Sequence, residues 1–219
     1  MSDRVDLGKY KTVVFDCDGV ILNSNHIKTE AFRRAATAYG EDAAEALVQY
    51  HVANGGVSRY KKFDHFLEYI VESDGKGLDR DQLLARFAEE VKAGLMKCEQ
   101  APGLTELRSQ HPKQTWMVVS GGDQEELREV FEKRGIASYF DGGIFGSPRT
   151  KEAILQQQLK CGELLFPAVF LGDSQYDLVA SHSIGIDFIF IAGWSEVKCL
   201  SAFLASNRVP FVPAVSFLI

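Results

Sequence analysis

Two aspartates two positions apart stand at the end of a short apolar run near the N-terminus. Asp16 and Asp18 follow residues 12–15, whose β-branched and aromatic side chains predict a buried strand. Asp173 follows another apolar run, residues 168–171. Carboxylates crowded at one place repel one another, and they need a cation if they are to be ionised together. Ligation by oxygen atoms alone suits Mg²⁺ rather than Zn²⁺, so this pattern predicts a magnesium site.

Phosphoryl transfer needs a nucleophile in line with the leaving oxygen, a proton donor for that oxygen, and groups that neutralise the equatorial oxygens. The chain offers candidates for each need. Asp16 and Asp18 supply two carboxylates, while Lys151 and Ser120, with the amides around Ser120, supply the neutralising groups. Ligands bind at the carboxyl ends of the strands in open α/β sheets. These residues therefore converge if the runs that precede them are neighbouring parallel strands.

The order of elements along the chain favours that arrangement. After Pro102-Gly103, strand-like apolar runs alternate with helical patterns, which predicts parallel strands joined by helical crossovers. Between the first strand and this point the patterns are helical only. We expect an α/β fold, a Rossmann-like parallel-sheet core (residues 1–21 and 101–219) with an inserted helical cap domain (residues 22–100). Strands are expected at 12–15, 115–119, 143–145, 168–171 and 188–191, and helices at 24–39, 41–52, 59–71, 79–95, 123–134, 151–161, 176–184 and 196–205.

Composition and charge narrow the partners. The net charge of -6 argues against a nucleic-acid surface. The N-terminal segment lacks the apolar stretch of a signal peptide, and no apolar run approaches the length of a membrane span. The cysteines Cys17, Cys98, Cys161 and Cys199 show no paired spacing, which is typical of reduced thiols in a cytosolic protein. We expect a cytoplasmic protein without nucleic-acid or membrane partners; its oligomeric state is not indicated.

The sequence resembles the haloacid dehalogenase superfamily, in the branch whose helical cap lies between the first strand and the rest of the core, among phosphatases and β-phosphoglucomutase-like proteins. The motifs that carry the resemblance occur in order along nearly the whole chain. They are VFDCDGV at 14–20, VVSGG at 118–122, Lys151, and LGDSQYD at 171–177. Each motif is weak alone, but the ordered set is specific.

The resemblance implies a Mg²⁺ site and a covalent mechanism. Asp16, Asp18 through its backbone carbonyl, Asp173 and Asp177 would form the metal site, Asp177 directly or through a bound water. Asp16 resembles the nucleophile that forms an aspartyl-phosphate, and Asp18 the general acid and later base.

Two further motifs would hold the phosphoryl group itself. Ser120, with the Gly121 amide, would hold a phosphoryl oxygen. Lys151 would neutralise charge on Asp16 and on the transferring group.

A basic, glycine-containing segment at residues 54–62 predicts contact with the substrate. Glycines allow close approach of the backbone, and Gly56, Arg59 and Lys62 are the candidates. In resembling enzymes such a loop of the cap faces the active site and contacts the leaving group. The alternative is an ordinary turn followed by a solvated basic face. His26, just past the first motif, could contact substrate or only cap a helix or pack.

Three functions fit this interpretation. The first is a Mg²⁺-dependent phosphatase acting on a small phosphorylated metabolite such as a sugar phosphate, the second a sugar phosphomutase, and the third a binding or regulatory protein that keeps the fold. The intact acidic set counts against the third. Asp18 counts against dehalogenase chemistry, because resembling dehalogenases lack a carboxylate there. The phosphonate-cleaving branch uses a lysine of the cap; Lys28, Lys61 and Lys62 are present, but the sequence places none of them suitably.

Overall fold

Six parallel strands form one sheet in the computed structural model, which describes residues 5–71 and 77–219. The order across the sheet is β3-β2-β1-β4-β5-β6, so β1 lies in the interior between β2 and β4. This confirms the expected α/β fold with a Rossmann-like parallel sheet. The strands are β1 (Thr12–Phe15), β2 (Thr115–Asp123), β3 (Ile144–Ser147), β4 (Ala168–Gly172), β5 (Asp187–Ile191) and β6 (Phe211–Val212).

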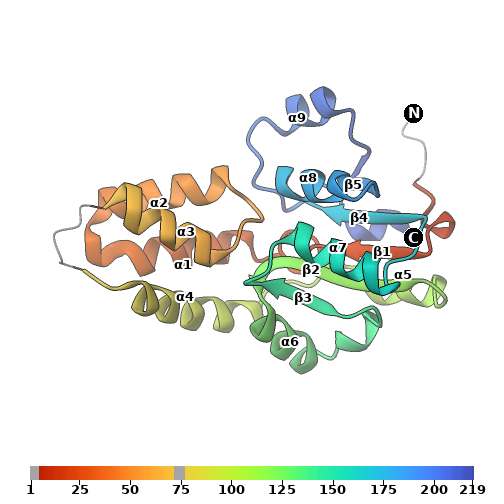
Figure 1. Cartoon of the computed structure of the whole chain (residues 1–219), viewed down its shortest axis with the longest axis horizontal. Coiled ribbons are helices and arrows are strands. Elements are labelled where there is room, and N and C mark those ends of the chain that lie inside the picture. Colours follow the sequence, from red (N-terminus) through yellow and green to blue (C-terminus); the bar gives the residue numbers. More distant parts are fainter. Residues whose placement is uncertain (1–4, 72–76) are drawn as a thin grey trace.

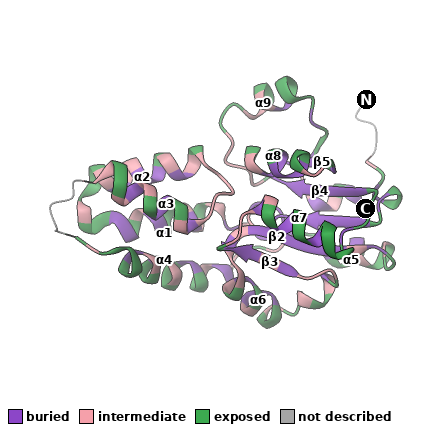
Figure 2. Cartoon of the chain, viewed as in Figure 1, coloured by how far each residue is buried: buried purple, intermediate pink, exposed green. Residues whose placement is uncertain are grey.

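The apolar runs of the strands are continuous because both faces of the sheet are covered. Val13 and Phe15 of β1 pack into one hydrophobic cluster together with Trp116, whereas Val14 packs into the other together with Phe170. Most residues of the strands are accordingly buried, as the purple strands in Figure 2 show. The helices of this part of the chain are α5 (Leu104–Gln110), which precedes β2, and α6 (Gln124–Lys133), α7 (Lys151–Cys161), α8 (Gln175–Ser183) and α9 (Leu200–Asn207), which follow β2, β3, β4 and β5 in turn.

Between β1 and β2 the chain forms a separate group of helices beside the sheet (Figure 1). We call residues 25–95 the helical segment. Its helices pack around the aromatic rings of Phe32, Phe63 and Phe87, which contact one another at centroid distances of 4.3–5.8 Å. The helices are α1 (Asn25–Ala36), α2 (Glu41–Ala53), α3 (Arg59–His65), which continues as a π-helix over Phe66–Ile70, and α4 (Arg80–Leu95).

Most of the expected elements are present, and the differences lie at their ends. β2 runs on to Asp123, whose side chain then caps α6. The helix expected from residue 196 begins only at Leu200, because the preceding loop is held against β4 instead: Ser195 Oγ donates to the carbonyl of Asp173 at 2.6 Å. The short helix α5 was not expected. Across the described part of the chain, no helix is long and apolar enough to cross a membrane.

Candidate active site

The register of the sheet brings distant residues to one edge. Phe15 of β1 pairs with Val118 on one side and with Leu171 on the other. The residues that follow each strand therefore emerge together at the carboxyl end, as expected for a ligand site in a parallel sheet. The Asp16 amide continues this alignment by donating to the Leu171 carbonyl at 2.9 Å.

Three buried carboxylates meet at this edge around one lysine. Oxygen atoms of Asp16, Asp173 and Asp177 lie within 4.8 Å of one another. Lys151 Nζ, at the start of α7, lies 3.0 Å from Asp16 Oδ1 and 2.5 Å from Asp177 Oδ1. The sequence-predicted residues are thus brought together with a cation at their centre.

The cluster holds three carboxylates but only one lysine, so its negative charges are not fully neutralised. Burial raises the pKa of Asp16 to about 7 against the opposing effect of Lys151, and Asp177 adds to the rise. Burial and the neighbouring Asp16 also raise the pKa of Asp173 well above its usual range. The pKa of Lys151 is raised, because the two carboxylates beside it outweigh its desolvation. A further cation would let all these carboxylates ionise together.

The carboxylates differ in how many protein donors they already have. One oxygen of Asp177 accepts from Lys151, and the other accepts from the amide and hydroxyl of Ser174 at 3.1 and 2.7 Å, closing a capping box at the start of α8. Asp173 Oδ2 accepts from Asn25 Nδ2 at 2.7 Å. Gly19, at φ +74°, permits this approach, since a Cβ there would lie 2.0 Å from Asp173 Oδ2. Asp177 is therefore positioned by protein contacts, whereas Asp16 and Asp173 keep acceptor capacity for a metal.

The atoms of Asp16, Asp173 and Asp177 that could ligate a metal are all carboxylate oxygens, which are the ligands that Mg²⁺ prefers. Burial, and after it the neighbouring carboxylates, raise the pKa values of Asp16 and Asp173, and a bound divalent cation would favour their ionised forms. The residues present therefore fit Mg²⁺.

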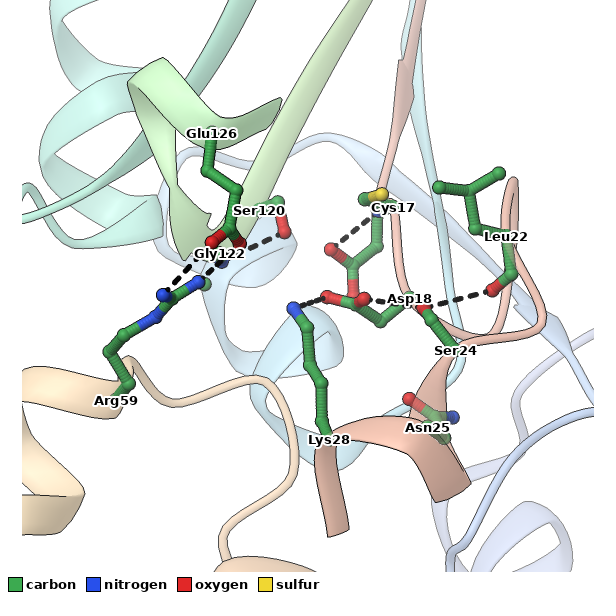
Figure 3. Close-up of polar contacts among 12 residues, drawn as sticks. Cys17, Asp18, Leu22, Ser24, Asn25, Lys28, Arg59, Ser120, Gly122 and Glu126 are labelled. Atoms are coloured by element: carbon green, nitrogen blue, oxygen red, sulfur yellow. Dashed lines mark hydrogen bonds and ion pairs between the residues drawn. The ribbon is translucent and has the colours of Figure 1, made fainter. Parts of the chain in front are cut away.

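Asp18 is held apart from the cluster by α1. Ser24 Oγ donates to Asp18 Oδ1 at 2.6 Å, and Lys28 Nζ donates to Asp18 Oδ2 at 2.5 Å (Figure 3). Burial alone would raise the pKa of Asp18, but the ion pair with Lys28 and the hydrogen bonds outweigh burial and hold that pKa below its usual value. Asp16 and Asp18 thus sit in opposite electrostatic environments.

The last residues of β2 lie between the cluster and the helical segment. Ser120 is fully buried, and its Oγ accepts from the Gly122 amide at 3.0 Å. A Cβ on Gly121 would lie 2.1 Å from the carbonyl oxygen of Gly56, in the loop before α3. Glycine is required where these two backbones touch. The predicted pair Gly56 and Gly121 therefore lies at the junction between the helical segment and the sheet.

A cavity of about 60 Å³ separates the helical segment from the carboxyl end of the sheet. Asp16, Asp18 and Asp173 line one side of it, and Arg59 and Lys62 the other. We call it the site cavity. It brings most of the sequence-predicted residues to one space, together with the apolar rings of Phe32 and Phe87.

Arg59 is engaged with the sheet side rather than left free. Its guanidinium donates to both oxygens of Glu126 on α6, at 3.1 and 2.5 Å, as Figure 3 shows. The side chains of Arg59 and Glu126 are only 5% and 9% exposed. The neighbouring Tyr60 hydroxyl donates to Asp123 at 2.7 Å. These contacts join α3 to the start of α6.

Lys62 lies beyond Arg59 in a different environment. Its Nζ lies 2.7 Å from His51 Nδ1 and 3.4 Å from the His51 carbonyl. His51 Nε2 contacts Thr29 Oγ1 at 3.1 Å, and Thr29 in turn donates to Glu196 at 3.2 and 3.3 Å. Burial and Lys28 lower the pKa of Lys62 to about 7. Burial and the two lysines also lower the pKa of His51, so its ring is neutral.

Several residues of the site had no signal in the sequence. Lys28, Asn25, His51 and Glu196 line the site cavity and were not predicted for it. Lys28 and Asn25 stand on α1, ten and seven residues after Asp18, so their distance from the first motif was the one available clue. His26, which was predicted, is exposed and is not among the residues that line the site cavity.

Known proteins resemble this chain in sequence and in fold. A model of the haloacid dehalogenase-like hydrolase family matches residues 10–185. Fructose-1-phosphate phosphatase YqaB of Escherichia coli (strain K12) is 22% identical over 188 residues, which cover 83% of this chain and 96% of that protein. CbbY from Rhodobacter sphaeroides, solved in complex with phosphate, has a TM-score of 0.69 at 17% identity, covering 94% of this chain and 95% of that one.

The L-2-haloacid dehalogenase from Xanthobacter autotrophicus has a TM-score of 0.60 at 16% identity, covering 95% of this chain and 96% of that one. At such identities the solved structures testify to the fold alone. The family model covers most of the chain and agrees with the resemblance drawn from the motifs. The protein belongs to the haloacid dehalogenase-like hydrolase family.

Proposed function

We propose that the protein is a Mg²⁺-dependent phosphatase that hydrolyses a small phosphorylated metabolite through an aspartyl-phosphate on Asp16. The observation that carries the proposal is the position of Lys151, 3.0 Å from Asp16 Oδ1, amid three buried carboxylates below a cavity. Asp16 faces a lysine and a candidate metal site at once, which is what a carboxylate that attacks a phosphate dianion requires.

Asp16, Asp173 and the Asp18 carbonyl would hold Mg²⁺, with Asp177 fixing Lys151 and reaching the metal through water. The metal would supply neutralisation of the charge on the phosphoryl oxygens. Asp177 has this outer role in the proposal because Lys151 and Ser174 already donate to its two oxygens.

In the first half-reaction the Asp16 carboxylate attacks phosphorus, and the bond from phosphorus to the leaving oxygen breaks. The anionic phosphate beside Asp18 would raise the pKa of that carboxyl so that it takes up a proton from solvent, and Asp18 would then give this proton to the leaving oxygen, so the alcohol departs neutral. Lys151, Ser120 and the backbone amides around Ser120 bind the phosphoryl oxygens. Their donors are fixed before reaction, which is how electrostatic stabilisation costs no reorganisation.

In the second half-reaction water attacks the phosphorus of the aspartyl-phosphate. Asp18, now ionised, takes a proton from that water, and the bond between phosphorus and the Asp16 oxygen breaks. Orthophosphate leaves and Asp18 is protonated again. The ion pair with Lys28 stabilises the ionised form of Asp18 that this step needs.

We further propose that residues 22–100 act as a cap over a core of residues 1–21 and 101–219, and that the cap selects the leaving group. The name of the Escherichia coli relative supports a sugar phosphate as the substrate class. The described chain has free cysteines at four positions, which supports a cytoplasmic site of action.

Phosphate release from a panel of phosphomonoesters with Mg²⁺ tests the proposal. We expect turnover that EDTA abolishes, and trapping of BeF₃⁻ on Asp16. Asp16→Asn should lose both while keeping its folded structure by circular dichroism. Full turnover in Asp16→Asn would refute the covalent step, and turnover undiminished by EDTA would refute the metal. Interconversion of isomers primed by a sugar bisphosphate, without net phosphate release, would indicate a phosphomutase instead.

A further inference from the structure

Lys62 is a buried lysine whose ammonium form has no carboxylate beside it. Its side chain is among the largest fully buried ones, at 2% exposure. Within residues 5–71 and 77–219, the other cations that line the site cavity have an acidic partner: Lys28 pairs with Asp18, and Arg59 with Glu126. No carboxylate of the described residues lies within ion-pair distance of Lys62. A desolvated charge without a partner is costly, so its retention calls for an explanation.

The groups around Lys62 fix the position of its Nζ without neutralising its charge. His51 is neutral, and its Nε2 hydrogen can be donated to Thr29, so its Nδ1 accepts from Lys62. The chain Lys62–His51–Thr29–Glu196 has one consistent direction of donation. The charges of Asp18 and Glu196 act on Lys62 from a distance, but burial and Lys28 outweigh them, and Glu196 is linked to Lys62 by hydrogen bonds only through two intervening side chains. Two of the three Lys62 hydrogens have acceptors in this arrangement, which leaves one donor for a ligand.

The position of Lys62 connects it to the reaction. It lines the site cavity together with Asp16 and Asp18, and its Nζ lies 5.5 Å from the centroid of the Phe32 ring. A phosphoryl group on Asp16 would meet Lys151, so Lys62 is left for the part of the substrate that extends from the leaving oxygen towards the helical segment. A neutral leaving group would bury this ammonium without compensation.

We propose that Lys62, positioned by His51, forms a second anion subsite, so that the substrate carries a second anionic oxygen group, a carboxylate or a phosphate, on its leaving group. The inference rests on the phosphatase function proposed above and narrows its substrate class to phosphomonoesters of anionic alcohols. An anion at this subsite would supply the partner that Lys62 lacks, and the apolar rings beside it would strengthen the interaction by excluding water.

Matched pairs of substrates test the subsite. Phosphoglycolate and 2-hydroxyethyl phosphate differ by a carboxylate in place of a hydroxymethyl group, and fructose 1,6-bisphosphate and fructose 1-phosphate differ by a second phosphate. We expect kcat/KM to favour the anionic member of at least one pair by roughly 10- to 100-fold, the range of a charge-assisted hydrogen bond. The pair that shows the preference identifies the group as carboxylate or phosphate.

Variants tie the preference to Lys62. Lys62→Met should reduce the anionic-to-neutral ratio of kcat/KM by roughly the same 10- to 100-fold, and Lys62→Arg should retain part of it. Lys113→Met, which removes an exposed lysine in the loop before β2, is the matched control and should leave the ratio unchanged. Thermal melting should show that Lys62→Met remains folded, since the change removes an unpaired buried charge.

The outcomes separate this inference from the phosphatase proposal. No phosphate release from any of the four esters with Mg²⁺ would contradict the phosphatase proposal; Kd ratios measured by calorimetry for the same pairs, with and without Lys62→Met, would then judge the subsite. A wild-type ratio near or below one in both pairs would overturn the second anion subsite. So would a ratio that Lys62→Met leaves intact.

Discussion

Without Mg²⁺, the free energy of unfolding of the protein should fall as the pH rises. The folded state holds a proton on Asp16 up to a pKa of about 7, whereas the ordinary value is 3.8. Between these values the folded state binds more protons than the unfolded state, so the free energy of unfolding falls with rising pH. Asp173, whose pKa is raised further by burial and by Asp16, acts in the same direction.

The size of the effect follows from the shift of Asp16. A rise from 3.8 to about 7 is roughly three units, and each unit corresponds to 1.36 kcal/mol, which gives about 4 kcal/mol. This stabilisation is present below about pH 4 and is lost as the pH rises through about 7. Bound Mg²⁺ favours the ionised carboxylates, so it should restore stability at high pH and do little at low pH.

Urea denaturation at pH 5 and pH 8, each with EDTA or with saturating Mg²⁺, measures this. We expect Mg²⁺ to raise the free energy of unfolding by several kcal/mol more at pH 8 than at pH 5. Asp16→Asn serves as the matched variant, because it removes the titrating carboxyl and should shrink the pH dependence seen in EDTA. An equal effect of Mg²⁺ at both pH values, or an unchanged pH dependence in Asp16→Asn, would refute the electrostatic account.

Three further changes test other parts of the site. Gly19→Ala should weaken Mg²⁺ binding and destabilise the fold by about 1–3 kcal/mol, because the new Cβ would lie 2.0 Å from an Asp173 oxygen at φ +74°; Mg²⁺ titration and thermal melting measure this. Glu126→Gln should cost about 3–5 kcal/mol in urea denaturation by leaving the Arg59 guanidinium buried without its counter-charge, whereas Glu125→Gln, at a side chain 79% exposed, should cost almost nothing. Lys28→Met should raise the pKa of Asp18 and move the alkaline limb of the kcat/KM profile to higher pH; an unmoved limb would show that Asp18 is not the acid.

The candidate site at the carboxyl end of the sheet could be predicted from sequence because local signals coincide there. Strands that are buried on both faces of a parallel sheet are continuous apolar runs, so the end of each run marks the end of a strand. The polar residue that follows it then lies at the carboxyl end of the sheet. Asp16, Ser120 and Asp173 were found in this way. Lys151 was found by its motif, and the structure adds the reason for its position: it begins α7 where α7 approaches α8.

The side of the site cavity formed by the helical segment was less predictable. The pattern of a helix indicates which face is buried, but not which residues pack against that face. Lys28 stands in an amphipathic helix and would be taken for a solvated lysine; it is buried because the start of α1 meets Asp18. His51 is buried at the end of α2 only through the packing of α1 and α3 against it. Glu196 was assigned to a helix, but the loop around it is held to the site through Ser195. These positions depend on tertiary contacts that no local pattern contains.

Part of the junction between the helical segment and the sheet is polar, although one cluster of buried apolar residues continues across it. Arg59 with Glu126, and Tyr60 with Asp123, are polar contacts. When the two surfaces separate, such contacts can exchange their partners for water, so breaking them in this way costs less than removing one partner while the other stays buried. The aromatic core of α1–α4 has no such alternative. A helical segment built in this way would keep its aromatic packing if it moved away from the sheet.

That asymmetry bears on Lys62. It lies on α3, three residues after Arg59, so a movement that hydrates Arg59 and Glu126 hydrates Lys62 as well. In water an ammonium has no need of a partner, and it can take up an anionic group from solution. When the helical segment returns, the ammonium and its anion are desolvated together, and their attraction strengthens as water leaves. An anionic leaving group would therefore favour the closed arrangement, whereas a neutral one would leave Lys62 to be dehydrated alone.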